Sequence, residues 1–211
     1  MSETLAKLKT AVIEGQALPA KEATEAALAE GIDPGKILLE ALVPAMDDVG
    51  YRYECGEYFV PEMLISVRAM KEGLKLLKPL LVDSDVKPAG RVVAGTVKGD
   101  LHDIGKNLVG MMLKGANFEI VDLGTNVSPD AFAEATREHG ASVVGISALL
   151  TTTMVGMKDA VAAVRAVDPG AKILVGGAPV TDEFAAEIGA DGFAKDAATA
   201  ANVAQELLAA R

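Results

Sequence analysis

A short motif near the middle of the sequence combines residue types that metal binding requires. Asp100 precedes His102 by two positions, and Gly105 follows the histidine by three. A carboxylate at this spacing can accept a hydrogen bond from one imidazole nitrogen and so hold the other nitrogen ready to bind a metal ion. On these residues alone, the alternative is a capping aspartate followed by an ordinary polar loop histidine.

The other residues with metal-binding or nucleophilic side chains are isolated in the sequence. Asp100, His102 and Asp103 could bind zinc or iron, but no second histidine lies at ligand spacing. The single cysteine, Cys55, excludes an internal disulfide and an all-cysteine metal site. We expect Cys55 to be a structural thiol rather than a ligand or nucleophile. His139 precedes a glycine and is expected at the end of a helix.

Two predicted elements flank the motif and must position it. A buried strand is predicted over 91–97, and a helix over 105–115. The motif is therefore a strand-to-helix turn at the carboxyl end of a strand. In open α/β sheets, ligands bind outside the carboxyl ends of the strands.

The second half of the chain alternates between strand and helix patterns. Strands are predicted over 91–97, 118–123, 142–147, 172–176 and 191–194, and helices over 105–115, 129–139, 153–167, 180–188 and 196–209. Such alternation is typical of a parallel sheet with helices on both faces. Five strands in this arrangement predict an α/β domain of flavodoxin-like, Rossmann-type fold over residues 91–211.

The first half of the chain has the apolar periodicity of helices. It predicts a four-helix bundle over residues 1–78, with Ser2 as the first N-cap. Pro44 lies inside the third predicted helix and predicts a kink or break there. Residues 79–90 contain two prolines and three charged residues, so they are predicted to link the bundle to the sheet domain.

The composition indicates which binding partners and which cellular compartment to expect. The 211 residues are 50% hydrophobic and 24% charged, which is typical of a soluble globular protein. The net charge of −10 argues against nucleic-acid binding, which depends on Lys and Arg contacts to phosphate. No apolar run approaches the roughly 20 residues of a membrane span, and the N-terminus lacks the pattern of a signal peptide. We therefore expect a cytoplasmic protein.

Three later motifs each lie at the end of a predicted strand of the same sheet. They are Ser147 with Leu149 and Thr151, then Gly176-Gly177, then Asp191-Gly192-Phe193. In this order, D-x-H-x-x-G, S-x-L and G-G resemble the signature of cobalamin-binding domains. The upstream half resembles the helical cap of methionine synthase and of the corrinoid proteins of anaerobic methyltransferase systems. The resemblance covers nearly the whole chain.

The resemblance implies a cobalamin or related corrinoid cofactor, as methylcob(III)alamin or cob(I)alamin, with its own base displaced. His102 would be the lower axial ligand of cobalt. Asp100 would accept hydrogen bonds from His102 and from the Ser147 hydroxyl, forming a relay. The implied cofactor contacts are Asp100, Leu101, His102, Asp103, Ile104, Gly105, Ser147, Leu149, Thr151, Gly176, Gly177, Asp191, Gly192 and Phe193. Without the resemblance, Ser147 could bond its own backbone and Gly176-Gly177 could be an ordinary turn.

The bundle would cover the upper face of the corrinoid. The stretch 56–62 resembles the segment that places an aromatic side chain over the methyl group, so Phe59 or Tyr58 is expected there, with Met63 nearby. Such a cap would exclude water from a reactive alkyl–cobalt bond. The alternative for each residue is simple packing in the bundle core.

The function implied by the resemblance is that of a corrinoid methyl carrier. A substrate-specific methyltransferase would load the methyl group, and a second methyltransferase would pass it to a thiol or tetrahydrofolate acceptor, with a reductive activase as a further partner. Because the substrate-binding, folate-binding and activation modules of methionine synthase are not found, turnover by this chain alone is not expected. The methyl donor stays open. The alternatives are a cobalamin-sensing regulator and the B12-binding subunit of an adenosylcobalamin mutase.

Overall fold

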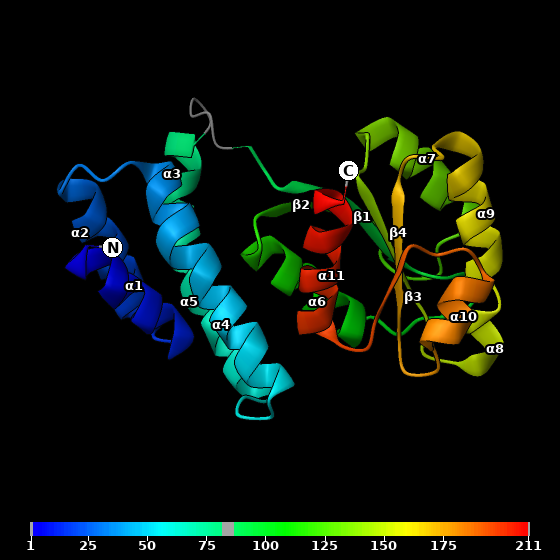
Figure 1. Cartoon of the computed structure of the whole chain (residues 1–211), viewed down its shortest axis with the longest axis horizontal. Helices are drawn as coiled ribbons and strands as arrows, with labels where there is room; N and C mark the ends of the chain where they lie inside the picture. Colours follow the sequence, from blue (N-terminus) through cyan, green and yellow to red (C-terminus); the bar gives the residue numbers. More distant parts are fainter. Residues whose placement is uncertain (1, 82–86, 211) are drawn as a thin grey trace. The chain divides into compact units, whose positions relative to one another are not determined.

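The two halves of the sequence form different architectures, as predicted. A computed structural model describes residues 2–81 and 87–210. It divides into two compact units, Met1–Lys87 and Pro88–Arg211. The first unit is helical and the second is α/β, with a five-stranded parallel sheet (Figure 1). The predicted fold class is confirmed.

The helical unit contains four helical rods in its described residues. They are α1 (Glu3–Ile13), α2 (Ala17–Ala29), a composite of α3 (Pro34–Ile37), η1 (Leu38–Leu42) and α4 (Val43–Glu54), and α5 (Val60–Leu81). The Ser2 hydroxyl caps α1 by accepting a hydrogen bond from the Leu5 amide, at 3.2 Å. Leucine, alanine and methionine side chains fill the centre of the bundle.

A π-helical turn precedes Pro44, where a kink or break is predicted, and the helix is not broken there. In η1, the Val43 amide donates to the Leu38 carbonyl, five residues earlier. Pro44 has no amide hydrogen, and in a regular α-helix its ring would press against the carbonyl of Glu40. The wider turn lies directly before the proline. The third rod therefore continues through Pro44 without interruption.

The predicted linker begins too early. Helix α5 continues through Pro79 to Leu81, so residues 79–81 are helical. Pro79 lies in the last turn, where its missing amide removes a single helical hydrogen bond. Residues 82–86 of the predicted linker lie outside the described residues, and the first strand begins at Gly90.

The sheet has the strand order β2-β1-β3-β4-β5, with every strand parallel to its neighbours. The strands are β1 (Gly90–Thr96), β2 (Phe118–Asp122), β3 (Val143–Ser147), β4 (Lys172–Gly176) and β5 (Gly192–Ala194). From β1 the chain goes first to β2 on one side and later to β3 on the other side. The pair β1 and β3 is therefore the topological switch point. Ligands of such sheets bind at the carboxyl ends of the strands beside the switch point.

Helices cover both faces of the sheet. Figure 1 shows α6 (Ile104–Gly115) and α11 (Ala197–Ala209) on one face, and α7 (Pro129–His139) and α9 (Met157–Val167) on the other. Two short helices, α8 (Thr151–Met154) and α10 (Asp182–Glu187), follow β3 and β4. The single helix predicted over 153–167 is wrong, because the chain turns at Val155-Gly156 and divides it into α8 and α9.

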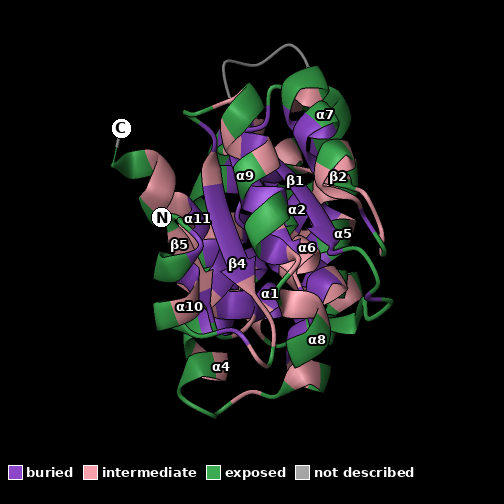
Figure 2. Cartoon of the chain, turned by 90° about the vertical axis from the view of Figure 1, so that its right-hand side faces the viewer, coloured by how far each residue is buried: buried purple, intermediate pink, exposed green. Residues whose placement is uncertain are grey.

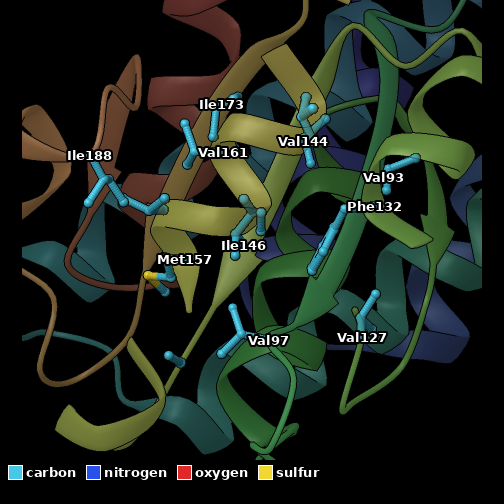
Figure 3. Packing of buried hydrophobic residues seen from close by; sticks show 14 of the residues in the cluster. Val93, Val97, Val127, Phe132, Val144, Ile146, Met157, Val161, Ile173 and Ile188 are labelled. Atoms are coloured by element: carbon cyan, nitrogen blue, oxygen red, sulfur yellow. The ribbon is translucent and has the colours of Figure 1, made fainter. Parts of the chain in front are cut away.

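Large aliphatic and aromatic side chains close the face under α7 and α9. Phe132, Val144, Ile146, Met157 and Ile173 belong to this cluster and are almost fully buried (Figure 3). Burial of each such side chain contributes about 1.5–3 kcal/mol. Strands β1 and β4 run through the buried interior of the domain (Figure 2). This face therefore supplies much of the stability of the domain.

The loops after β3 and β4 pass each other at van der Waals distance. Gly177 has φ +132°, and a Cβ atom added to it would overlap the carbonyl oxygen of Ala148. The Ala148 amide also donates to the Gly176 carbonyl, at 3.2 Å. Packing between the two loops therefore requires glycine at position 177, apart from any contact with a ligand.

Gly177→Ala is expected to lower the free energy of unfolding by about 3 kcal/mol, since backbone strain and steric overlap add. Gly189→Ala is the matched control, because Gly189 also has positive φ, at +77°, but open space around it. The control should cost about 1 kcal/mol from the backbone alone. Urea unfolding of the two variants measures the difference, and equal losses would contradict the close packing of the loops.

Candidate functional site

The loop after β1 is held in one conformation by its own backbone and by a strand residue. Gly99 has φ +85°, and the Asp100 amide donates to the Val97 carbonyl at 3.1 Å, which closes the turn. The buried hydroxyl of Thr96 donates to the carbonyl of His102, at 2.9 Å. The end of β1 therefore fixes the position of the histidine.

The carboxylate of Asp100 is fully buried and joins this loop to the loop after β3. Its Oδ1 atom accepts hydrogen bonds from the His102 amide at 3.0 Å and from His102 Nδ1 at 2.7 Å. Its Oδ2 atom accepts from the Leu149 amide at 2.8 Å and from the Thr153 hydroxyl at 2.7 Å. Burial alone would raise the pKa of Asp100, but these hydrogen bonds outweigh it and hold the pKa well below its usual range. The side chain is therefore an anion.

The anionic Asp100 determines the tautomer of His102. A carboxylate only accepts hydrogen bonds, so Nδ1 of the neutral imidazole must carry the hydrogen and Nε2 must carry the free lone pair. The side chain of His102 is 51% exposed, so this lone pair is accessible from outside the protein. The arrangement is that of a metal-binding histidine oriented by a second carboxylate.

Thr153, and not Ser147, supplies the hydroxyl that bonds to Asp100. Ser147 ends β3, and among the described residues its hydroxyl is not one of the donors to this carboxylate. Thr153 lies in α8, which turns its hydroxyl back toward the end of β1. The predicted relay is therefore corrected to Thr153–Asp100–His102. Three consecutive threonines, 151–153, gave no sign in the sequence of which one would reach the carboxylate.

Exposed apolar side chains lie on the two loops that Asp100 joins. This apolar platform consists of Leu101, Ile104, Leu149, Leu150 and Val155. Leu101 and Ile104, on either side of His102, are 73% and 77% exposed. Apolar surface gathered around a polar centre marks a binding surface. Asp103, between them, is exposed and accepts a hydrogen bond from the Asn107 side chain at 3.1 Å.

The sheet face under α6 and α11 carries small residues near its carboxyl end. These residues form the small-residue face: Ala94, Gly145, Ser147, Gly176 and Ala194. Gly145, Ser147 and Gly176 are partly exposed, although they belong to the inner strands β3 and β4. A Cβ atom added to Gly145 would have no heavy atom closer than 3.8 Å. Space is therefore left beside Gly145 on this face.

Three residues at helix N-termini border the same end of the sheet. Gly105, in the first turn of α6, is exposed, and an added Cβ would meet no heavy atom within 4 Å. The hydroxyl oxygen of Thr199, in the first turn of α11, is buried and has no hydrogen-bond partner in the described part of the chain. Thr151 begins α8 and is exposed.

Residues 191–193 have different environments. Asp191 precedes β5, at the edge of the sheet opposite His102, where its carboxylate accepts from the Ile173 amide at 2.6 Å and pairs with Arg165 at 2.5 Å. A Cβ atom on Gly192 would press against α11, and Phe193 packs against the core on the other face. The prediction that these residues stand at the ligand-binding end of the last strand is wrong for Asp191, which has a structural role.

The aromatic candidates of the helical unit have different environments. Phe59, the residue before α5, is 66% exposed. Tyr58 donates its hydroxyl to the Ile13 carbonyl at 3.1 Å and packs its ring against Arg52, 5.4 Å from the guanidinium carbon. Met63 is 1% exposed, because its position on α5 turns it into the bundle core, so the expectation that it lies beside a ligand does not match its burial.

Two features are not found within residues 2–81 and 87–210, a metal-binding cluster and a membrane-spanning helix. No group of three or more His, Cys, Asp or Glu side chains there is placed to hold a metal ion. Within the same residues, the structure contains no helix with the length and apolar character needed to cross a membrane.

Sequence reasoning missed three residues of this site: Thr96, Thr153 and Asn126. Thr96 and Thr153 donate hydroxyl hydrogen bonds to the His102 loop, and Asn126 contacts it from the loop after β2. Thr96 lies near the end of a predicted strand, Asn126 follows another and Thr153 begins a predicted helix, but no motif singles out any of them. Their position could have identified them, because all three residues lie near the carboxyl edge of the sheet.

In comparisons with known proteins, the α/β unit and the helical unit each match a B12 binding domain. Models of the B12 binding domain match residues 90–203 and residues 4–78. A corrinoid protein of Desulfitobacterium hafniense is 38% identical over 209 residues, 97% of each chain. A dimethylamine corrinoid protein of Methanosarcina acetivorans is 38% identical, covering 98% of each chain.

A solved structure of a methanol:cobalamin methyltransferase complex from Methanosarcina barkeri contains a similar chain. It is 29% identical, with a TM-score of 0.87, over 100% of this chain and 81% of that one. The family match covers more than half of the chain, and the relatives match along nearly its whole length. The chain therefore belongs to the family of B12-binding corrinoid proteins.

Proposed function

We propose that this protein is a corrinoid methyl carrier in which His102 Nε2 is the lower axial ligand of cobalt. The observation that carries the proposal is the 2.7 Å contact between His102 Nδ1 and the buried carboxylate of Asp100. The buried Asp100 anion holds Nδ1 as a donor and leaves the lone pair on Nε2, and exposed Leu101 and Ile104 lie on either side of His102 in the chain. When bound, the corrinoid supplies a cobalt centre that can accept and release a methyl group.

The residues around His102 fit a corrinoid with its own base displaced. The apolar platform offers leucine, isoleucine and valine side chains to the broad face of a macrocycle. The small-residue face and the open space at Gly105 support a place for the displaced nucleotide tail between the sheet and α6 and α11. A polar tail would also supply the partner that the buried Thr199 hydroxyl lacks among the described residues.

The helical unit, in this proposal, is the cap over the upper face of the corrinoid. Phe59 is the better of the two aromatic candidates, because its side chain is exposed while Tyr58 is tied to α1. The Phe59 backbone is itself held, since its amide donates to Glu62 Oε2 at 3.0 Å. An exposed aromatic ring on a fixed backbone is suited to excluding water from a bound cofactor.

Partner methyltransferases would load and unload the cofactor. Relatives are a dimethylamine corrinoid protein and a chain in a methanol:cobalamin methyltransferase complex, which supports a substrate-specific methyltransferase as the first partner. A second methyltransferase, acting on a thiol or tetrahydrofolate, and a reductive activase complete the proposed cycle. The chain itself contributes the lower ligand, the relay and the cap, and the partner determines the methyl donor.

His102→Ala is expected to bind cobalamin without a protein nitrogen ligand. The ultraviolet–visible spectrum of the reconstituted wild type should be that of a base-off, histidine-ligated corrinoid, and the variant should lose the features of the nitrogen ligand. EPR of the cobalt(II) form with ¹⁵N-labelled histidine identifies the ligating atom. His139→Ala, at the end of α7, is the control and should match the wild type. Failure of the wild type to take up stoichiometric corrinoid would overturn the carrier proposal.

Thr153→Val removes the hydroxyl bonded to Asp100 and should weaken corrinoid binding about 10- to 100-fold, as loss of a residue that orients a metal ligand commonly does. Thr153→Ser retains the hydroxyl and should stay near the wild-type affinity. Ser147→Ala separates the corrected relay from the predicted one, and its histidine-ligated spectrum should be unchanged. A larger loss of histidine ligation in Ser147→Ala than in Thr153→Val would contradict the corrected relay.

The two aromatic residues should respond differently to substitution. Tyr58→Phe loses the hydrogen bond to the Ile13 carbonyl and should destabilise the protein by about 1 kcal/mol. Phe59→Ala removes an exposed ring and should change stability by less than about 0.5 kcal/mol, while altering the spectrum of the bound corrinoid. Urea unfolding and absorption spectra of both variants provide the test. A Phe59→Ala spectrum identical to that of the wild type would remove Phe59 from the proposed cap.

A further inference from the structure

Asn126, in the loop between β2 and α7, has a backbone conformation that side chains rarely adopt. Its φ is +57°, and Asn117 is the only other described non-glycine residue with positive φ. Asparagine tolerates this left-handed region better than most residues, but the conformation still costs free energy. Other contacts of Asn126 at the carboxyl edge of the sheet must therefore compensate for this free-energy cost.

Two hydrogen bonds connect Asn126 to the loop that carries His102. The Oδ1 atom of Asn126 accepts from the Gly99 amide at 2.8 Å. The Asn126 amide donates to the Asp100 carbonyl at 3.0 Å. The first bond holds the backbone before Asp100 and the second holds the backbone after it. Asn126 thus fixes both backbone sides of the residue whose carboxylate orients the imidazole.

The support for Asn126 is itself anchored to the sheet. The Thr96 amide donates to the Gly124 carbonyl at 3.0 Å, and the Val127 amide donates to the Thr96 carbonyl at 2.9 Å. Val97 and Val127 form a parallel bridge. The residues on both sides of Asn126 are therefore paired with the end of β1, so Asn126 holds the loop against a rigid strand.

We propose that Asn126 is a positioning residue that, through Asp100, sets the tautomer and direction of the His102 imidazole. Backbone position decides where the buried carboxylate lies, and the carboxylate decides which imidazole nitrogen carries the hydrogen. Movement of the Gly99–Asp100 backbone lengthens the hydrogen bond between Asp100 and Nδ1 and releases the ring. The significance of this effect for cobalt binding rests on the proposed function, but the tautomer itself belongs to the protein without cofactor.

Asn126→Gly tests the proposal, because glycine adopts positive φ without strain and retains the amide that donates to Asp100. Only the side-chain bond to Gly99 is lost. Asn117→Gly is the matched control, with the same substitution at φ +64° in the turn between α6 and β2. Asn126→Asp keeps an acceptor oxygen at the same position and serves as the rescue variant. Asn126→Ser, whose side chain is shorter, is a second loss variant if the glycine variant does not fold.

The measurement is ¹⁵N NMR of the imidazole nitrogens in the cofactor-free protein, where His139 is an internal reference. In wild type, Asn117→Gly and Asn126→Asp, the neutral His102 imidazole should carry its hydrogen on Nδ1 and its lone pair on Nε2. Asn126→Gly and Asn126→Ser should show a mixture of tautomers for His102 and an unchanged His139. Their affinity for cobalamin should fall about 10- to 100-fold.

A folded Asn126→Gly or Asn126→Ser variant with the wild-type His102 tautomer would overturn the proposal. So would an equal change of tautomer in Asn117→Gly. Failure of the carrier function has a different signature: the wild type would take up no corrinoid, while the change of tautomer in the Asn126 variants would still be observed.

Discussion

The hydrogen bonds of one buried carboxylate determine how this site is built. Asp100 is inaccessible to solvent, so its charge must be compensated inside the protein, and four donors from two loops supply that compensation. The donors can meet only if β1 and β3 are neighbours, which the strand order β2-β1-β3-β4-β5 ensures. The direction of the His102 ring is therefore a product of the tertiary fold, and a short loop by itself could not hold it.

The two faces of the sheet divide stability and binding between them. Under α7 and α9, large side chains such as Phe132 and Ile146 are almost fully buried. Under α6 and α11, glycine, alanine and serine leave parts of the inner strands accessible. Small residues contribute little apolar burial, so the domain depends on the opposite face for much of its hydrophobic stabilisation. This separation allows one face to accept a ligand without loss of the core.

The sequence was most informative where periodicity or a spaced motif encodes structure. Strand and helix patterns predicted the α/β fold, and the spacing of Asp100 and His102 predicted their hydrogen bond. Contacts that depend on loop paths were not predictable. The path of the chain after β3 brings Thr153 in α8 to Asp100, and the start of β5 at Gly192 leaves Asp191 at the far edge of the sheet. A helical pattern also could not tell that Pro44 would be accommodated by a π turn.

The close packing of the loops after β3 and β4 limits how segments can be exchanged between related proteins. Because Gly177 leaves no room between itself and the Ala148 carbonyl, the segments after β3 and β4 form one steric unit. A chimera that takes the β3 segment, with Leu149 and Thr153, from one protein and the β4 segment from another would join two surfaces shaped for different neighbours. Recombination between relatives should therefore preserve both segments together, with a crossover point that lies before β3 or after the second glycine.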